Sequence, residues 1–221
     1  MILVYTLVFS QIMQAKLPGT NSMYAYSIYL CTGILTWNFF SEIIGRSQGV
    51  FIENANLLKK LSFPRICLPV IISTSAFLNF LIIFILFLIF ITATNNFPGL
   101  PLAATIPLIL LQTTFALGLG ITVGVLNVFF RDVGQLMGVL LQLWFWFTPI
   151  IYPITIIPSW ARQYIAMNPM TNLMNAYQTI FVQHQWPDWT SLWLVTMLSA
   201  LMLALGLHLF RKHSADMVDE L

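Results

Sequence analysis

The stretch FLIIFILFLIFI, residues 80–91, contains only large apolar side chains. It lies inside a longer apolar segment, residues 67–94, that carries no charged residue. A helix needs about 20 apolar residues to cross the hydrocarbon core of a bilayer. Residues 67–94 therefore predict a transmembrane helix.

The composition extends this prediction to the whole chain. Of its 221 residues, 59% are hydrophobic and only 7% are charged. Soluble domains carry about 25% charged residues, because their surfaces face water. The sequence therefore predicts an all-α membrane protein with several spans. The formal net charge of +2 is too small to indicate a nucleic-acid partner.

Five further apolar stretches predict six spans in one transmembrane domain, residues 1–221. The first stretch is short and predicts a truncated helix. The stretches are residues 1–15, 26–45, 103–130, 134–152 and 190–210.

The positions of the basic residues predict the orientation. Cytoplasmic loops of membrane proteins carry an excess of Lys and Arg. With both termini in the cytoplasm, seven of the nine Lys and Arg residues lie inside and two outside. The inside set is Arg46, Lys59, Lys60, Arg65, Arg131, Arg211 and Lys212, and the outside set is Lys16 and Arg162.

The segment GVFIENANLLKKLSFPR, residues 49–65, is the most polar cytoplasmic connection. Its apolar residues recur at helical spacing between polar ones, which predicts an amphipathic helix. Such a helix is able to lie on the membrane surface. It is equally suited to docking a cytoplasmic partner, and the residues alone favour neither alternative.

Two other connections stand out. Arg131-Asp132 is a short polar turn between two spans, consistent with an ion pair that anchors the helix ends. The outer segment 148–189 begins with TPIIYPITIIP, in which three prolines prevent a straight helix. Irregular backbone at membrane depth needs protein or a water-filled cavity around it, so this segment predicts short helices that dip in from the outer face.

Several kinds of site have no sequence support. The chain lacks the GxxxxGK[ST] loop of ATP-binding proteins. Its three histidines are scattered, and its two cysteines have no metal-ligand spacing. The spans carry almost no charge, and only Glu42 approaches an embedded carboxylate, so coupling to ions is poorly supported. The energy for any transport is expected from a separate ATPase.

The aromatic run Trp144-Phe145-Trp146-Phe147 precedes Thr148-Pro149. Trp and Tyr concentrate at membrane interfaces, which explains part of this pattern. Four consecutive aromatic residues, however, cover all sides of a helix, so at least one ring must face protein or a cavity. Sugar rings pack on aromatic faces, and a channel lined by such rings is suited to a long glycan.

Small residues predict close packing of one span. Gly118, Gly120 and Gly124 lie in the stretch 103–130, and the last two form a small-xxx-small pair. We expect this surface to approach a neighbouring helix closely.

Four motifs together resemble a known family. They are Phe63-Pro64-Arg65, FFRDV at 129–133, WFTPIIY at 146–152 and Asn168-Pro169. This order is similar to that in the membrane components of type-2 ABC exporters for O-antigen, capsular polysaccharide and teichoic acid. The similarity extends over nearly the whole chain.

The resemblance implies an architecture and a set of partners. Family members have six transmembrane helices, form homodimers in the bacterial cytoplasmic membrane and pair with two ATPase subunits. ATP and Mg²⁺ belong to those subunits, and this chain is expected to bind no cofactor and no metal. A coupling helix maps to about 49–62, and two short re-entrant helices map to 148–172. Members usually begin with an amphipathic helix before the first span, whereas Met1 stands almost inside it.

The resemblance also implies roles for particular residues. The lipid-linked glycan is expected to pass along aromatic side chains, and the polar face of the coupling helix is expected to contact the ATPase. The path residues are Trp144, Trp146, Phe147 and Tyr152; the coupling residues are Glu53, Asn56, Lys59 and Lys60; the turn residues are Arg131 and Asp132.

Three alternatives remain open at this level. A type-2 ABC exporter of drugs or other lipids would share the fold. A membrane enzyme acting on lipid-linked sugars would need embedded acidic or histidine residues, which the spans do not supply. A non-catalytic assembly subunit would show no export defect on deletion.

Overall fold

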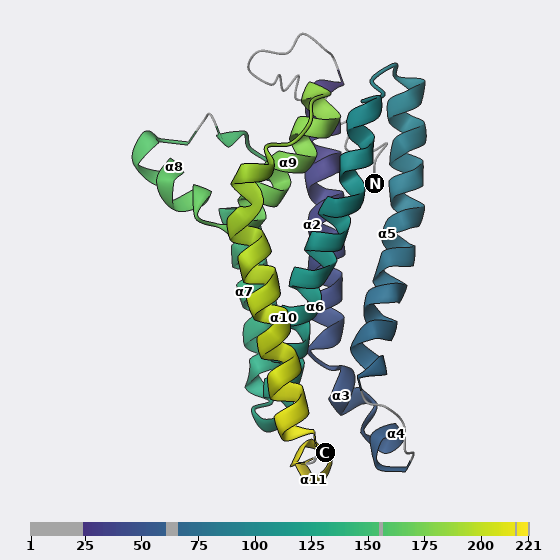
Figure 1. Cartoon of the computed structure of the whole chain (residues 1–221), viewed down its shortest axis with the longest axis vertical. Helices are drawn as coiled ribbons and strands as arrows, with labels where there is room; N and C mark the ends of the chain where they lie inside the picture. The colour runs from purple at the N-terminus through teal and green to yellow at the C-terminus, as the bar shows by residue number, and fades with distance from the viewer. Residues whose placement is uncertain (1–23, 61–65, 155–156, 215, 221) are drawn as a thin grey trace. The chain divides into compact units, whose positions relative to one another are not determined.

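The computed structural model describes residues 24–60, 66–154, 157–214 and 216–220 (Figure 1). Within these ranges the chain is helical and contains no strand. The elements are α2 (Ala25–Ser47), α3 (Val50–Glu53), α4 (Ala55–Lys60), α5 (Cys67–Ala93), η2 (Leu100–Ala104), α6 (Thr105–Phe129), α7 (Asp132–Phe147), α8 (Ser159–Ala166), α9 (Pro169–Gln183), η4 (Trp189–Leu192), α10 (Trp193–His213) and α11 (Asp216–Glu220). The predicted first span, residues 1–15, lies outside the described residues.

Among the described residues, three helical segments are long and apolar enough to cross a membrane. They are Cys67–Ala93, Leu100–Phe129 and Trp189–His213, at the predicted spans 67–94, 103–130 and 190–210. Helix α2 covers the predicted span 26–45, but it contains polar residues and is not among these three segments. Helix α7 has only 16 residues and ends at Phe147 rather than at residue 152.

Contacts divide the chain into two compact units. The first unit comprises Met1–Asn38, Phe80–Ile109 and Phe145–Trp193. The second comprises Phe39–Asn79, Leu110–Trp144 and Leu194–Leu221. Helices α2, α5 and α6 each contribute one part to each unit.

The first unit has an aromatic core around α9. Phe181 of α9 packs edge to face on Phe84 and Phe87 of α5, with ring centroids 6.0 and 5.2 Å apart. Helix α9 begins at a well-formed cap, because the Asn168 side chain accepts a hydrogen bond from the Met170 amide at 3.0 Å and proline follows at the first helical position. Helix α8, by contrast, contacts α9 but has no buried residue.

The second unit has a continuous apolar core. Phe51 of α3 stacks on Phe210 of α10, with ring centroids 5.7 Å apart. Met217 of α11 is also buried in this cluster. The cluster is formed by Val50, Phe51, Leu68, Ile72, Ile121, Val125, Val128, Phe210 and Met217.

The predicted glycine surface of α6 is present in the second unit. A Cβ atom at Gly118 would overlap the backbone of Met202 and Leu203 in α10. A Cβ atom at Gly120 would lie 2.8 Å from the Ser47 Cβ. The absence of side chains therefore allows α6 to approach α10 on one face and the end of α2 on another.

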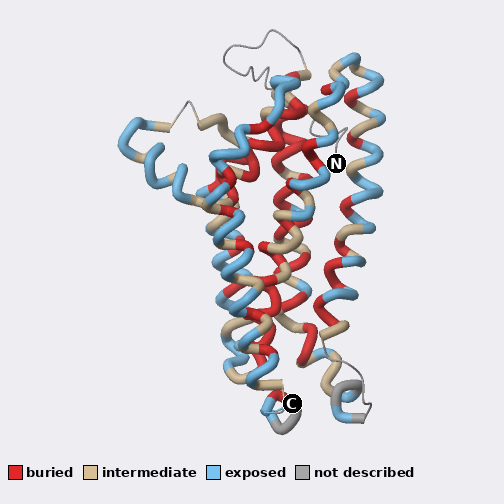
Figure 2. The backbone as a smooth tube through the Cα atoms, in the orientation of Figure 1, coloured by how far each residue is buried: buried red, intermediate tan, exposed pale blue. Residues whose placement is uncertain are grey.

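Large apolar side chains cover the outside of α5. Figure 2 shows exposed positions along this helix, whereas α2 is buried over most of its length. Exposed apolar surface of this extent is expected to meet lipid rather than water. The exposed large residues of α5 are Val70, Ile71, Leu78, Leu81, Ile82, Ile83, Ile85, Leu86 and Ile89.

Candidate functional site

The aromatic run lies at the end of α7, where the helix stops. Pro149 lacks an amide hydrogen and disfavours helical geometry in Thr148, so the helix ends at Phe147. The helix therefore ends five residues before the end of the predicted span 134–152, which stays a prediction. Thr148, Pro149 and Ile150 are nevertheless buried. Their backbone groups need partners because the helix no longer supplies them.

Two tyrosines of α2 supply these partners. The Tyr29 hydroxyl lies 3.0 Å from the Pro149 carbonyl oxygen and 2.9 Å from that of Tyr152, and its single proton bonds one of them at a time. The Tyr26 hydroxyl donates to the Ile151 carbonyl at 2.9 Å. These contacts hold the segment 149–152 against α2.

Helix α9 holds the same segment from a second side. The Gln178 side-chain amide donates to the Pro149 carbonyl at 3.3 Å. The Asn168 side-chain amide donates to the Thr148 hydroxyl oxygen at 3.1 Å. Sequence reasoning missed Tyr26, Tyr29 and Gln178. The prolines were a usable signal, because they leave carbonyl groups that must find donors elsewhere.

Gly33 permits the close approach of this segment to α2. A Cβ atom at Gly33 would lie 3.0 Å from the Ile150 Cγ2 and 3.3 Å from its carbonyl oxygen. Ile150 itself is fully buried. The segment 148–152 is thus a fixed irregular structure, which we call the outer clamp after the side of the membrane predicted for it.

The four aromatic rings of the run have two kinds of environment. In the second unit, Trp144 packs edge to face on Phe40 and Phe115, with ring centroids 5.4 and 6.3 Å apart. In the first unit, Phe145 packs on Trp37 at 5.7 Å. Trp146 and Phe147 instead expose 59% and 65% of their surface. Of the predicted path residues in this run, only Trp146 and Phe147 present an open ring.

Tyr152, the fourth predicted path residue, returns to the end of α7. Its hydroxyl donates to the Trp146 carbonyl at 2.6 Å. The first unit therefore places Trp146 and Tyr152 side by side, with the exposed Phe147 next in the chain. Flat exposed rings of this kind are suited to packing on the faces of sugars, but the arrangement contains no acid, base or nucleophile pair for catalysis.

The predicted coupling helix, about 49–62, is two short helices instead of one. Helix α3 ends at Glu53 because Asn54 leaves helical geometry and its side-chain amide donates to the Val50 carbonyl at 2.8 Å. Helix α4 then begins at Ala55. Asn side chains compete for backbone groups in this way and commonly interrupt helices.

The two helices keep the amphipathic character that the sequence predicted. Val50 and Phe51 are buried in the core of the second unit. Glu53, Asn56 and Lys59 are exposed. The side chain of Lys60 lies outside the described part of the structure. Helix α11 contacts α4, so the end of the chain lies beside the predicted coupling residues.

The Arg131-Asp132 turn joins α6 to α7, as predicted, but not through an ion pair. Both side chains are exposed, and the ion pairs found among the described residues include neither. Asp132 is the first residue of α7, where a carboxylate interacts favourably with the helix dipole.

Asn127 stabilises this turn and was missed by sequence reasoning. Its side-chain oxygen accepts a hydrogen bond from the Gly134 amide at 2.7 Å. Its side-chain nitrogen donates to the Gln48 carbonyl at 2.8 Å. One buried side chain thus connects the end of α6, the start of α7 and the residue that follows α2.

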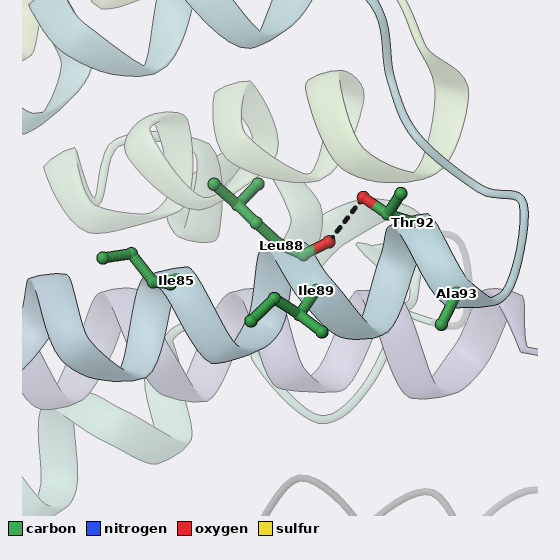
Figure 3. Close-up of a pocket in the computed structure, with 5 residues that line it drawn as sticks. All are labelled: Ile85, Leu88, Ile89, Thr92 and Ala93. Carbon is green, nitrogen blue, oxygen red and sulfur yellow. Dashed lines mark hydrogen bonds between the residues drawn. The ribbon is translucent and has the colours of Figure 1, made fainter.

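Other features of the described residues provide no chemical site. No group of three or more His, Cys, Asp or Glu side chains is placed to hold a metal ion within the described ranges. A surface hollow is lined by Ile85, Leu88, Ile89, Thr92 and Ala93, all of α5 (Figure 3). The Thr92 hydroxyl already donates to the Leu88 carbonyl at 2.8 Å, so its proton is not available to a ligand.

The helices, the apolar outer surface and the clamp define a multi-pass membrane protein that contains no recognisable catalytic site in its described part. Residues 1–182 match the family model of the ABC-2 type transporter. The chain therefore belongs to the ABC-2 type transporter family, whose members are transport proteins.

Relatives with assigned names agree with this membership. The chain is 29% identical to the O-antigen export system permease protein RfbA of Myxococcus xanthus, over 99% of this chain and 83% of the relative. It is also 29% identical to the protein of the same name from Klebsiella pneumoniae, over 81% of this chain and 68% of that relative.

Proposed function

We propose that this chain is the membrane-spanning subunit of an ABC exporter that moves a lipid-linked polysaccharide out of the bacterial cytoplasm. The observation that carries this proposal is the similarity to an O-antigen export permease over 99% of the chain. ATP hydrolysis is assigned to a separate subunit, because the chain has no nucleotide-binding loop of the GxxxxGK[ST] type.

The proposed topology has six spans with both termini in the cytoplasm. The three segments that are long and apolar enough to cross a membrane support three of these spans, and the distribution of Lys and Arg supports the orientation. Helices α2 and α7 are proposed as spans that cross within the protein assembly, where polar residues and a shorter length are tolerated. Two copies of the chain and two ATPase subunits form the proposed exporter.

The proposed glycan path passes the outer clamp. Trp146 and Phe147 support this role because their rings are large, flat and exposed. Tyr152 adds a ring whose hydroxyl is fixed to the Trp146 backbone. Trp144 is proposed to act differently from the others, since its ring is packed on Phe40 and Phe115 and sets the position of the run.

The proposed ATPase contact is the polar face of α3 and α4. Glu53, Asn56 and Lys59 are exposed there, while Phe51 anchors α3 in the core. Movement of the ATPase subunits would reach the spans through this anchored pair of helices. The outer clamp would stay rigid, because its carbonyl groups are bonded to both α2 and α9.

Deletion of the gene in its own bacterium tests the proposal. Loss of surface polysaccharide, with lipid-linked glycan accumulating on the cytoplasmic face of the membrane, is expected. Restoration by the wild-type chain serves as the control. Unchanged surface polysaccharide together with a defect in the release of drugs or simple lipids would contradict the proposal and favour another substrate class.

A further inference from the structure

A polar cluster joins α2 and α5 within the second unit, and none of the motifs discussed above includes it. The Glu42 Oε1 atom accepts hydrogen bonds from Arg46 Nη1 at 3.1 Å and from Asn79 Nδ2 at 2.9 Å. Arg46 Nη1 also lies 3.5 Å from the Ser75 hydroxyl oxygen. Two pairs of residues, each separated by four positions, thus face one another on two helices.

This cluster lies at membrane depth. Helix α5 has 27 residues, which at 1.5 Å per residue gives a length of about 40 Å. Asn79 is next to the middle of that helix, so it lies near the centre of a hydrocarbon core about 30 Å thick, whereas Arg46, in the last turn of α2, lies nearer to the predicted cytoplasmic interface. Charged groups at this depth are costly when they face lipid, and they commonly mark substrate pathways.

The cluster is nevertheless open at the surface of the chain. The Arg46 and Glu42 side chains expose 46% and 30% of their surface, and Asn79 is also exposed. The neighbouring exposed residues of α5, such as Leu78 and Ile82, are apolar. An ion pair with an exposed amide at this depth requires water or polar ligand groups in front of it, because acyl chains cannot solvate it.

We infer that Glu42, Arg46, Ser75 and Asn79 form a sugar-binding station in the inner half of the export path, which extends the proposed function. The cluster combines one positive and one negative side chain, so it carries no net charge. A diphosphate group would meet the Glu42 carboxylate and be repelled. Sugar hydroxyl groups both donate and accept hydrogen bonds, and therefore match a site that contains carboxylate, guanidinium, amide and hydroxyl groups.

The station complements the outer clamp chemically. The exposed rings of Trp146 and Phe147 pack on the faces of sugar rings and hold no sugar tightly. The cluster instead binds the hydroxyl groups of the sugars. A glycan bonded to such a site exchanges hydrogen bonds with water at little net cost as it moves. The inner station therefore favours the entry of sugar over the entry of a lipid without sugar.

The variant Asn79→Leu tests this inference in the intact exporter. It removes one polar group and retains a side chain of similar size. We expect export per assembled complex to fall at least tenfold, while thermal stability and ATPase pairing stay near wild type. Thr74→Val is the matched control, because Thr74 is exposed on the same helix but its hydroxyl bonds the Val70 carbonyl of its own helix.

A second readout identifies the ligand. ATPase activity of the purified complex is measured with lipid-free glycan and, separately, with an isoprenoid diphosphate without sugar. Asn79→Leu is expected to reduce stimulation by the glycan and to leave stimulation by the diphosphate unchanged. Loss of the diphosphate response instead would overturn the assignment to sugar.

The remaining outcomes are also decisive. Normal export by Asn79→Leu refutes the station. If export falls only in proportion to the loss of folded protein, the cluster stabilises the fold and the station is refuted. If export falls together with the loss of the dimer, the cluster contacts a second copy of the chain and the station is refuted as well. Failure of the wild-type chain to export glycan would instead reject the proposed function, and the station with it.

Discussion

Tyr29 contributes a single buried hydroxyl group to the outer clamp. The hydroxyl serves two carbonyl groups, those of Pro149 and Tyr152, which the proline-rich sequence leaves without helical partners. Because both the hydroxyl and the Pro149 carbonyl are buried, their hydrogen bond is formed out of water. Removing one partner from such a pair costs the desolvation of the other.

Tyr29→Phe is therefore expected to lower the free energy of unfolding by about 1–3 kcal/mol. A shift of the thermal midpoint of the purified chain in detergent measures this effect. Tyr24→Phe is the control, since the Tyr24 ring contacts Phe90 and its hydroxyl has no hydrogen bond with any described residue. Equal midpoints for Tyr29→Phe and wild type would show that the clamp does not depend on this hydroxyl.

Trp144 and Trp146 differ in environment although they are two positions apart. Trp146→Ala is expected to abolish export without changing the folded state, because its exposed ring makes few contacts that stabilise the fold. Trp144→Ala is expected to reduce stability by roughly 2 kcal/mol, because its ring packs on Phe40 and Phe115.

Surface polysaccharide and thermal stability of both variants separate the two roles. Rescue of export by Trp146→Tyr, which restores a flat ring, is part of the expected result. Normal polysaccharide on cells carrying Trp146→Ala would remove Trp146 from the glycan path.

Packing of α6 on α10 depends on Gly118, which has no side chain. Gly118→Val would force the two backbones apart, and we expect a loss of about 1–3 kcal/mol. Gly138→Ala is the matched control, because a Cβ atom there meets nothing within 4 Å and alanine favours the helix. The yield of folded protein and its thermal midpoint measure both changes, and a neutral Gly118→Val would contradict the observed packing.

Helix α11 joins the end of the chain to the proposed ATPase contact. Met217 is 1% exposed in the cluster that also holds Phe51, and α11 contacts α4. Met217→Asp would bury a charge, displace α11 and loosen α3. We expect weaker copurification of the ATPase, while Glu220→Gln on the exposed end of α11 should have no effect. Full ATPase binding by Met217→Asp would show that the coupling segment is held without α11.

Elements were predicted best where periodic apolar residues decided them. The stretch 67–94 became α5 almost to the residue, because nothing interrupts it. The break at Asn54 was not predicted, since it depends on one side-chain hydrogen bond to Val50. The clamp was anticipated only as irregular backbone, because two of its donors, Tyr26 and Tyr29, lie more than 100 residues away in α2.

At the scale of the whole molecule, composition and charge placement were sufficient to predict a helical membrane protein. Motifs such as FFRDV and WFTPIIY predicted the exporter family. The match of residues 1–182 to the ABC-2 type transporter family confirms this prediction. The path residues stay predictions. Glu42 was recognised as unusual, but its connection to Asn79 required the fold, because the two residues are 37 positions apart.

Transport by the purified exporter is the most direct test of the central claim. The chain and its ATPase are reconstituted in vesicles of phosphatidylethanolamine and phosphatidylglycerol, with lipid-linked glycan in the membrane. When ATP is added on the ATPase side, the glycan is expected to become inaccessible to a glycosidase on that side. With a hydrolysis-deficient ATPase, the glycan is expected to stay accessible. Glycan that stays accessible while ATP is hydrolysed would contradict the claim that this chain supplies a polysaccharide path.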